Sequence, residues 1–268
     1  MICDSHFHVF GPAERYPPHA ADLRYKPPHA PLESYLLHAK KLGIERYVFV
    51  QPSSYGRDNA CMLDAMREVG PAKCRGIVDI DENASDAALE RLHAAGVRGV
   101  RVNVNPIKPS EPGFAASMRS RISRLDARCA DHGWMLDFLT PGWLTRELLP
   151  TLEKLRSPFS LAHMGMFLAK EALPRDFVEF SRNHSKCWIK LTGVYRLSSA
   201  PGFADAAPLA QALIAAAPDR VIWGSDYPHL SFSHVDTDEL FGLLKAWAPE
   251  EAVRRRILED NPARCFGF

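Results

Sequence analysis

Short apolar segments alternate with helix-like segments along almost the whole chain of 268 residues. Eight apolar segments have the residue types of buried strands, at residues 2–6, 46–51, 75–80, 96–103, 134–139, 159–164, 187–193 and 220–226. Helical spacing, with Ser or Asp near several starts and Gly at several ends, marks residues 31–43, 58–70, 85–96, 114–133 and 205–219. This alternation predicts parallel strands joined by right-handed crossovers.

Eight strand–helix units are what a (β/α)8 barrel needs, and the chain has the length of about 250 residues that is typical of this fold. An open, doubly wound sheet is the competing arrangement. We predict an α/β fold with a single (β/α)8 TIM barrel domain over residues 1–268. Residues 250–268 are expected to form a helix with a tail that closes the barrel base or docks on its rim.

The charges of the sequence are nearly balanced, with 33 basic and 32 acidic residues and a formal net charge of +1. The sequence has no basic or acidic block, so neither nucleic acid nor a membrane is an expected partner, whereas a homo-oligomer stays open. The first residues do not resemble a signal peptide and no apolar run approaches about 18 residues, which favours the cytoplasm. Without a C-x-x-C pair, the six cysteines are expected to be reduced: Cys3, Cys61, Cys74, Cys129, Cys187 and Cys265.

Two histidines separated by one phenylalanine lie in the first strand-like segment, within "DSHFHVFGP" at residues 4–12. Side chains on a strand alternate between faces, so His6 and His8 point the same way and Phe7 points the opposite way. Alone, such a pair can equally be two polar residues on a solvated strand face. The proline-rich stretch at residues 11–31 that follows is too long for an ordinary connection, and we expect it to help build a pocket.

Polar residues recur at the ends of other predicted strands, where a barrel of this type gathers its active site. Besides the first strand, these are Arg98 and Arg101, Asp137, His163 and Asp226. Three imidazoles and one carboxylate from distant parts of the chain are therefore expected to meet. Such a group can hold zinc and activate water, or the carboxylate can act as a general base while the imidazoles polarise a carbonyl.

Two charged residues on the predicted strands have alternative roles. Asp137 can face the pocket or pair with a neighbouring helix, and Lys190 can be a catalytic group or the partner in an ion pair inside the barrel. The remaining histidines fall in loops or helical segments and are expected at the surface: His19, His29, His38, His93, His132, His184 and His234.

Five stretches of the sequence together resemble the amidohydrolase superfamily, and within it the branch similar to 2-pyrone-4,6-dicarboxylate lactonase. They are "DSHFHVFGP", "FVQPSSYGRDN", "GVRGVRVN", "LAHMG" and "VIWGSDYPH". The resemblance implies that Asp226 deprotonates a water that attacks a lactone carbonyl, while the imidazoles of His6, His8 and His163 polarise that carbonyl. It implies that no metal is required, although other superfamily members use this set as zinc ligands. A lysine that bridges two metals has no counterpart in "GVRGVRVN", so two metals are not expected.

The resemblance also implies residues that bind the substrate, namely Arg101, Arg196, Tyr25, Ser53 and Ser54, with Tyr195 and His229 beside matched positions. A third arginine of the pyrone-dicarboxylate enzymes falls on Ile107, with Lys108 next to it. Because a buried carboxylate without its bidentate partner binds less well, we expect a substrate with fewer or differently placed carboxylates.

The sequence therefore predicts a hydrolase that opens the lactone ring of a small carboxylated compound from aromatic degradation or sugar-acid metabolism. A zinc-dependent enzyme of the same superfamily, such as a decarboxylase, is the first alternative, with His6, His8, His163 and Asp226 as ligands. A lactone isomerase and a barrel that binds without catalysis are the others.

Overall fold

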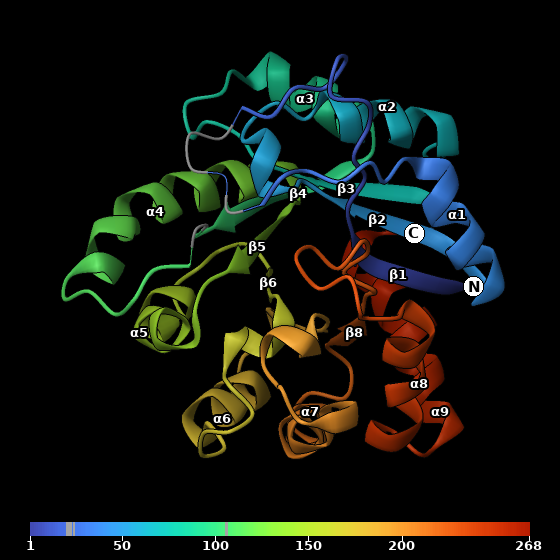
Figure 1. Cartoon of the computed structure of the whole chain (residues 1–268). Coiled ribbons are helices and arrows are strands. Elements are labelled where there is room, and N and C mark those ends of the chain that lie inside the picture. The colour runs from blue at the N-terminus through green and yellow to red at the C-terminus, as the bar shows by residue number, and fades with distance from the viewer. Residues whose placement is uncertain (20–22, 24, 105–106) are drawn as a thin grey trace.

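Eight parallel strands form one sheet in the order β1 to β8, which curls into a nearly closed barrel with the helices outside it (Figure 1). The computed structural model describes residues 1–19, 23, 25–104 and 107–268. The strands are β1 (Ile2–Phe7), β2 (Ile44–Val50), β3 (Cys74–Val78), β4 (Val97–Asn103), β5 (Met135–Leu139), β6 (Phe159–Leu161), β7 (Cys187–Leu191) and β8 (Val221–Trp223). All eight predicted strands are confirmed. Of the two predicted arrangements, the structure has the barrel and not the open sheet.

Helices follow the strands as the alternation predicts, and every helical segment inferred from the sequence contains one. They are α1 (Leu32–Lys41), α2 (Ala60–Val69), α3 (Asp86–Ala94), α4 (Phe114–His132), α5 (Gly142–Leu152), α6 (Arg175–Asn183), α7 (Ala207–Ala216), α8 (Thr237–Trp247), α9 (Glu251–Arg255) and α10 (Asn261–Phe266). Local sequence sets several ends: the Ser85 hydroxyl accepts from the Ala88 N–H at the start of α3, and α4 ends where Gly133 takes a left-handed φ of 65°.

The C-terminal segment closes the base of the barrel, which was one of its two expected positions. Phe266 at the end of α10 is 1% exposed and packs among buried residues inside the barrel, including Cys3 and Met135 at the starts of their strands. The Arg75 guanidinium donates to the carbonyl oxygens of Phe266 and Gly267. The opposite, C-terminal ends of the strands are therefore left to form a site.

Backbone hydrogen bonds hold together the two ends of the long connection between β1 and α1. Phe10 and Ala30 exchange backbone hydrogen bonds of 2.9 and 3.1 Å, so the ends of the loop lie together. Four of its residues, 20–22 and 24, lie outside the described part of the chain.

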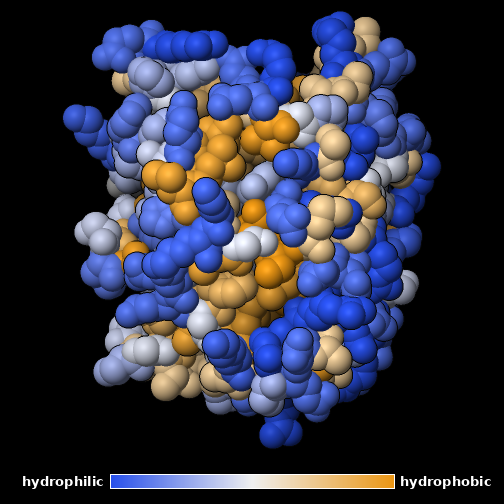
Figure 2. All heavy atoms as spheres, turned by 90° about the vertical axis from the view of Figure 1, so that its right-hand side faces the viewer, coloured by the Kyte–Doolittle hydropathy of each residue, from blue (hydrophilic) through white to orange (hydrophobic). Residues whose placement is uncertain are grey.

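Hydrophobic side chains gather in the middle of the face that carries α1 and both termini, and hydrophilic ones surround them (Figure 2). Leu37 of α1 is 73% exposed. The homo-oligomer stays a prediction. Among the described residues, no helix combines the length and the apolar character that crossing a membrane requires.

Candidate active site

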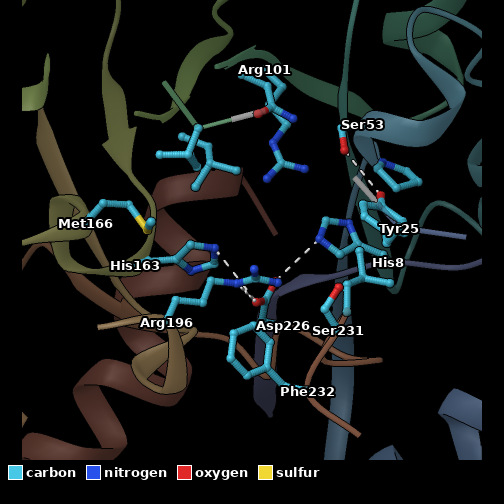
Figure 3. A pocket seen from close by; sticks show the side chains of 15 residues that line it. His8, Tyr25, Ser53, Arg101, His163, Met166, Arg196, Asp226, Ser231 and Phe232 are labelled. Atoms are coloured by element: carbon cyan, nitrogen blue, oxygen red, sulfur yellow. Dashed lines mark hydrogen bonds and ion pairs between the residues drawn. The ribbon is translucent and has the colours of Figure 1, made fainter. Parts of the chain in front are cut away.

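A cavity of about 380 Å³ opens at the C-terminal ends of the strands (Figure 3). Its volume lies in the range of small-molecule sites, about 300 to 1,000 Å³. Seven of the residues predicted for the site line it: His8, Tyr25, Ser53, Arg101, His163, Arg196 and Asp226. His6 is fully buried beside Asp226, and Ser54 is fully buried but does not line the cavity.

The three predicted imidazoles converge on one carboxylate. His6 Nε2 and His8 Nε2 lie 3.5 and 3.4 Å from Asp226 Oδ1. The third imidazole comes from the other side, with His163 Nε2 3.8 Å from Asp226 Oδ2. The expected meeting of strand ends from the beginning, middle and end of the chain is therefore present.

The two oxygens of Asp226 have different surroundings. Oδ2 accepts a 2.5 Å hydrogen bond from the Tyr195 hydroxyl and lies 3.1 Å from Arg196 Nε. Oδ1 faces His6 and His8. Sequence reasoning gave Tyr195 a minor place and assigned Arg196 only to the substrate, whereas both hold the carboxylate. Their position after β7, in the same short loop as Gly193, is the signal that was available.

Gly193 permits the close packing of this loop against the cluster. Its φ is 54°, in the left-handed region, and a Cβ at this position would lie 2.5 Å from His163 Nδ1. A side chain is therefore excluded by the backbone conformation and by the imidazole. The same His163 nitrogen lies 2.7 Å from the Thr192 hydroxyl, which fixes the ring.

Hydrogen-bond partners determine how the His8 ring presents itself. His8 Nδ1 lies 2.7 Å from the carbonyl oxygen of Val50, which can only accept, so Nδ1 carries the hydrogen. The Nε2 of the neutral ring then points a lone pair at Asp226 Oδ1, also an acceptor, 3.4 Å away. A water that donates to both, or a cation, would satisfy this pair.

Asp137 and Lys190 form an ion pair inside the barrel, which is one of the two roles expected for Lys190, whereas Asp137 pairs with this residue of β7 and not with a helix. Lys190 Nζ lies 2.7 Å from Asp137 Oδ1, and both side chains are fully buried and outside the cavity lining. Lys190 Nζ also lies 3.4 Å from His6 Nδ1. Arg101 lines the cavity and also approaches this buried ion pair. Its Nη1 donates to the Gln51 carbonyl oxygen, and its Nε lies 3.9 Å from Asp137 Oδ2.

Arg98 does not reach the site, which corrects its place among the strand-end candidates. Its guanidinium donates to the carbonyl oxygens of His93 and Val97 on the outside of the barrel. His229 is buried, lies 3.4 Å from the Thr237 hydroxyl and does not line the cavity.

Burial keeps the imidazoles neutral. It lowers the pKa of His163 to about 3 and, together with the charge of Lys190, holds the pKa of His6 well below its usual range. Burial alone would raise the pKa of Asp226, but the groups around it, among them the charged guanidinium of Arg196, hold it well below its usual range. The cluster therefore pairs an ionised carboxylate with neutral rings near neutral pH.

The donor set fits a single zinc ion. One atom each from the buried residues His6, His163 and Asp226 lies within 4.8 Å of the others. His6 Nε2 is buried without a hydrogen-bond partner among the described residues. Imidazole nitrogen and carboxylate oxygen are ordinary ligands of zinc.

Apolar side chains form much of the remaining wall: Ile107, Leu139, Met166, Leu230 and Phe232. Lys108 is exposed and outside the lining, with its Nζ 5.5 Å from the centre of the Phe114 ring. The cationic groups that line the cavity within the described residues are therefore Arg101 and Arg196.

Known proteins resemble the chain over nearly its full length. A 4-sulfomuconolactone hydrolase of Hydrogenophaga intermedia is 36% identical, with 98% of this chain and 88% of that protein covered. A 2-pyrone-4,6-dicarboxylate hydrolase of Comamonas testosteroni is 31% identical, with 98% and 89% covered. The solved structure of a candidate 2-pyrone-4,6-dicarboxylic acid hydrolase from Pseudomonas putida superimposes with a TM-score of 0.86 at 29% identity, covering 99% and 97% of the two chains.

The sequence model of the Amidohydrolase family matches residues 3–268. This span contains every residue of the cluster around Asp226. The chain therefore belongs to the amidohydrolase family, and the resemblance of its motifs to the lactone-hydrolysing branch is confirmed.

Proposed function

We propose that this chain hydrolyses the lactone ring of a small carboxylated compound, of the kind that sugar-acid metabolism or the degradation of aromatic compounds produces. The observation that carries the proposal is that the two carboxylate oxygens of Asp226 have different partners. Tyr195 and Arg196 hold Oδ2, while Oδ1 faces two imidazoles at the wall of a cavity of about 380 Å³. The names of the similar hydrolases support the same class of reaction.

In the proposed reaction, a water in the cavity that donates to both His8 Nε2 and Asp226 Oδ1 gives a proton to Oδ1 as its oxygen adds to the lactone carbonyl carbon. His6 and His163 then lie beside the carbonyl oxygen, which gains negative charge, and a hydrogen on either ring stabilises it. The ring C–O bond breaks when the tetrahedral centre collapses. The proton on Asp226 passes to the leaving oxygen, so the product is a ring-opened acid and the carboxylate is restored.

The substrate's own carboxylate is expected to lie near Arg101 and Arg196, because a guanidinium fork matches a carboxylate. Tyr25 and Ser53, whose hydroxyl oxygens lie 3.2 Å apart at the cavity wall, are expected to accept or donate hydrogen bonds to the bound compound. Ser54 is fully buried outside the cavity lining and is expected to support this wall.

Zinc is compatible with the proposal but is not needed for its proton transfers. His6, His163 and Asp226 would hold the ion, with His8 adjacent, and a bound zinc would act as a Lewis acid on the carbonyl and acidify a water. Arg196 and Lys190 bring positive charge next to these ligands, which opposes a second cation in the cluster.

A lactone panel tests the proposal directly. Purified protein, with and without chelator, is supplied with sugar-acid, muconate-derived and pyrone lactones, and proton release is followed. Ring opening of at least one lactone is expected, and Asp226→Asn should lower kcat by about 100-fold or more, which is the usual contribution of a general base. If no lactone opens and a carboxylated phenol loses CO2 or a lactone is isomerised instead, the proposal is wrong.

A further inference from the structure

The barrel closes where β1 meets β8 and the residues that follow it, directly under the reacting groups. We call this junction the seam. Two backbone hydrogen bonds join the strands at this point, from Asp226 N to the His6 carbonyl oxygen at 2.8 Å and from His8 N to the Tyr227 carbonyl oxygen at 2.9 Å. These bonds belong to residues at and just beyond the strand ends. The distance between the histidine pair and the carboxylate therefore depends on how this seam is closed.

The buried carboxylate of Asp4, two residues before His6 in β1, adds a side-chain link across the seam. Asp4 is fully buried, and its Oδ1 accepts hydrogen bonds of 3.0 Å from both the His6 N–H and the Ser225 N–H. Its Oδ2 accepts a 2.9 Å hydrogen bond from the Tyr35 hydroxyl. One oxygen atom therefore joins the N–H of a histidine of the cluster to the N–H that immediately precedes Asp226.

The two strands approach each other closely here. A Cβ on Gly224 would lie 2.6 Å from His6 N and 2.7 Å from His6 Cβ, so only glycine allows this spacing. Asp226 itself has a φ of 55°, in the left-handed region that a non-glycine residue adopts only when its surroundings hold it there. The hydrogen bonds on either side of it supply that restraint.

We propose that Asp4 is a positioning residue, whose carboxylate oxygen ties β1 to β8 and so sets the separation of His6 and His8 from Asp226. Asp4 does not line the cavity and acts on the reaction only through these neighbours. This inference rests on the proposed function for its kinetic consequence. Its structural content, two amide hydrogens held by one side-chain oxygen, does not depend on the substrate.

Two substitutions of Asp4 separate hydrogen bonding from charge. Asp4→Asn keeps an oxygen at the position of Oδ1, and the Tyr35 hydroxyl can rotate to accept from the new amide. Asp4→Ala removes the acceptor and leaves both N–H groups unpaired. Because a displacement of the reacting groups by about 1 Å can cost about 100-fold in rate, kcat on the lactone identified from the panel should fall at least about tenfold in Asp4→Ala, with KM nearly unchanged, and stay close to wild type in Asp4→Asn.

Tyr35→Phe is the matched control, because it removes a bond to Asp4 but leaves the oxygen that joins the strands. Its kcat should stay close to that of the wild type. If Asp4→Ala does not fold, Gly224→Ala tests the same seam from the other strand, and it should lower kcat without raising KM. An unchanged kcat in the folded Asp4→Ala or Gly224→Ala protein would overturn the inference, as would an Asp4→Asn protein as impaired as Asp4→Ala.

Hydrogen exchange of the His6 and Ser225 amides gives a readout without a substrate. Exchange should be slow in wild type and in Asp4→Asn, and faster in Asp4→Ala than the global loss of stability explains. If the wild type opens no lactone but the exchange pattern holds, the proposed function fails and the role of Asp4 stands. If lactones are opened but the amides exchange equally in all proteins, the role of Asp4 fails.

Discussion

The hydroxyl of Tyr195 donates a 2.5 Å hydrogen bond to Oδ2 of Asp226, the same oxygen that Arg196 Nε approaches to 3.1 Å. Both donors come from one helical turn, Val194–Arg196, directly after β7. Because they occupy one carboxylate oxygen, they orient the other toward His6 and His8. The loop after β7 is therefore as much a part of the proposed catalytic unit as the strand ends.

Removal of the Tyr195 hydroxyl should slow the reaction. Tyr195→Phe removes one of the two hydrogen bonds described for Oδ2, so the carboxylate is less well oriented, and kcat should fall about tenfold, the value of one hydrogen bond to a charged group. Steady-state kinetics on the lactone from the panel measures this. Tyr47→Phe is the control, because that hydroxyl bonds the Ile44 carbonyl oxygen away from the cavity. Equal kinetics in the two variants would contradict the orienting role.

The dependence of kcat/KM on pH should show no acidic limb near the usual pKa of histidine. Asp226 has a pKa well below its usual range, so its basic form is lost only when pH falls through that low value. Burial lowers the pKa of His163 to about 3, so this ring also gains its proton only in strong acid. We expect a flat profile between about pH 5 and about pH 8. An acidic limb near pH 6.5 would contradict this prediction, and it would point to a ring of the cluster or to Asp4, whose pKa burial raises to about 6.

Strand alternation and barrel closure account for the parts of the site that the sequence predicts. The spacing of His6 and His8 places both on one face, and a closed ring of strands brings Asp226 to them from the other end of the chain. The same alternation explains the error at Arg98. It lies three positions from Arg101, an odd spacing that puts the two on opposite faces of β4.

The contacts that the sequence did not predict depend on loops and on pairing between strands. Tyr195 follows β7 in a turn whose path no periodicity specifies, so its hydroxyl could not be aimed at Asp226. Asp137 and Lys190 lie on different strands, and only the barrel register brings them within 2.7 Å. From the sequence, Asp4 is simply a residue of a buried strand. Its link to Ser225 becomes visible only when β8 lies beside β1.

Removal of metal should leave the reaction in place. The proposed proton transfers use Asp226 and the imidazoles, and the guanidinium of Arg196 already balances the carboxylate. After dialysis against a chelator, we expect kcat to stay within about twofold of the untreated protein, well under the tenfold that a loss of about 1.4 kcal/mol in transition-state stabilisation would give. Elemental analysis of the same samples confirms that metal has been removed. Loss of activity with recovery on added zinc would instead assign His6, His163 and Asp226 as zinc ligands.

Ile107 should influence whether the enzyme prefers lactones with one carboxylate or with two. Its side chain lines the cavity among apolar neighbours. Ile107→Arg offers a new guanidinium, so kcat/KM for a dicarboxylated lactone should rise about tenfold relative to a monocarboxylated one, as a charged hydrogen bond allows. Ile107→Met, of similar size but uncharged, is the control. The same ratio in both variants would mean that position 107 does not contact the substrate's anionic group.

Phe266 should affect stability and not the reaction, because it fills the base of the barrel at the end away from the cavity. Its side chain is 1% exposed and packs against Cys3, Met135 and their neighbours, so Phe266→Ala leaves a cavity and should cost about 3 to 5 kcal/mol of unfolding free energy. For a chain of this size that corresponds to a fall in Tm of about 10 °C. Below the new Tm, kcat and KM should match the wild type. A fall in kcat in the folded variant would show instead that the packing of the base positions His6 and Asp226, which would link the C-terminal tail to the cluster.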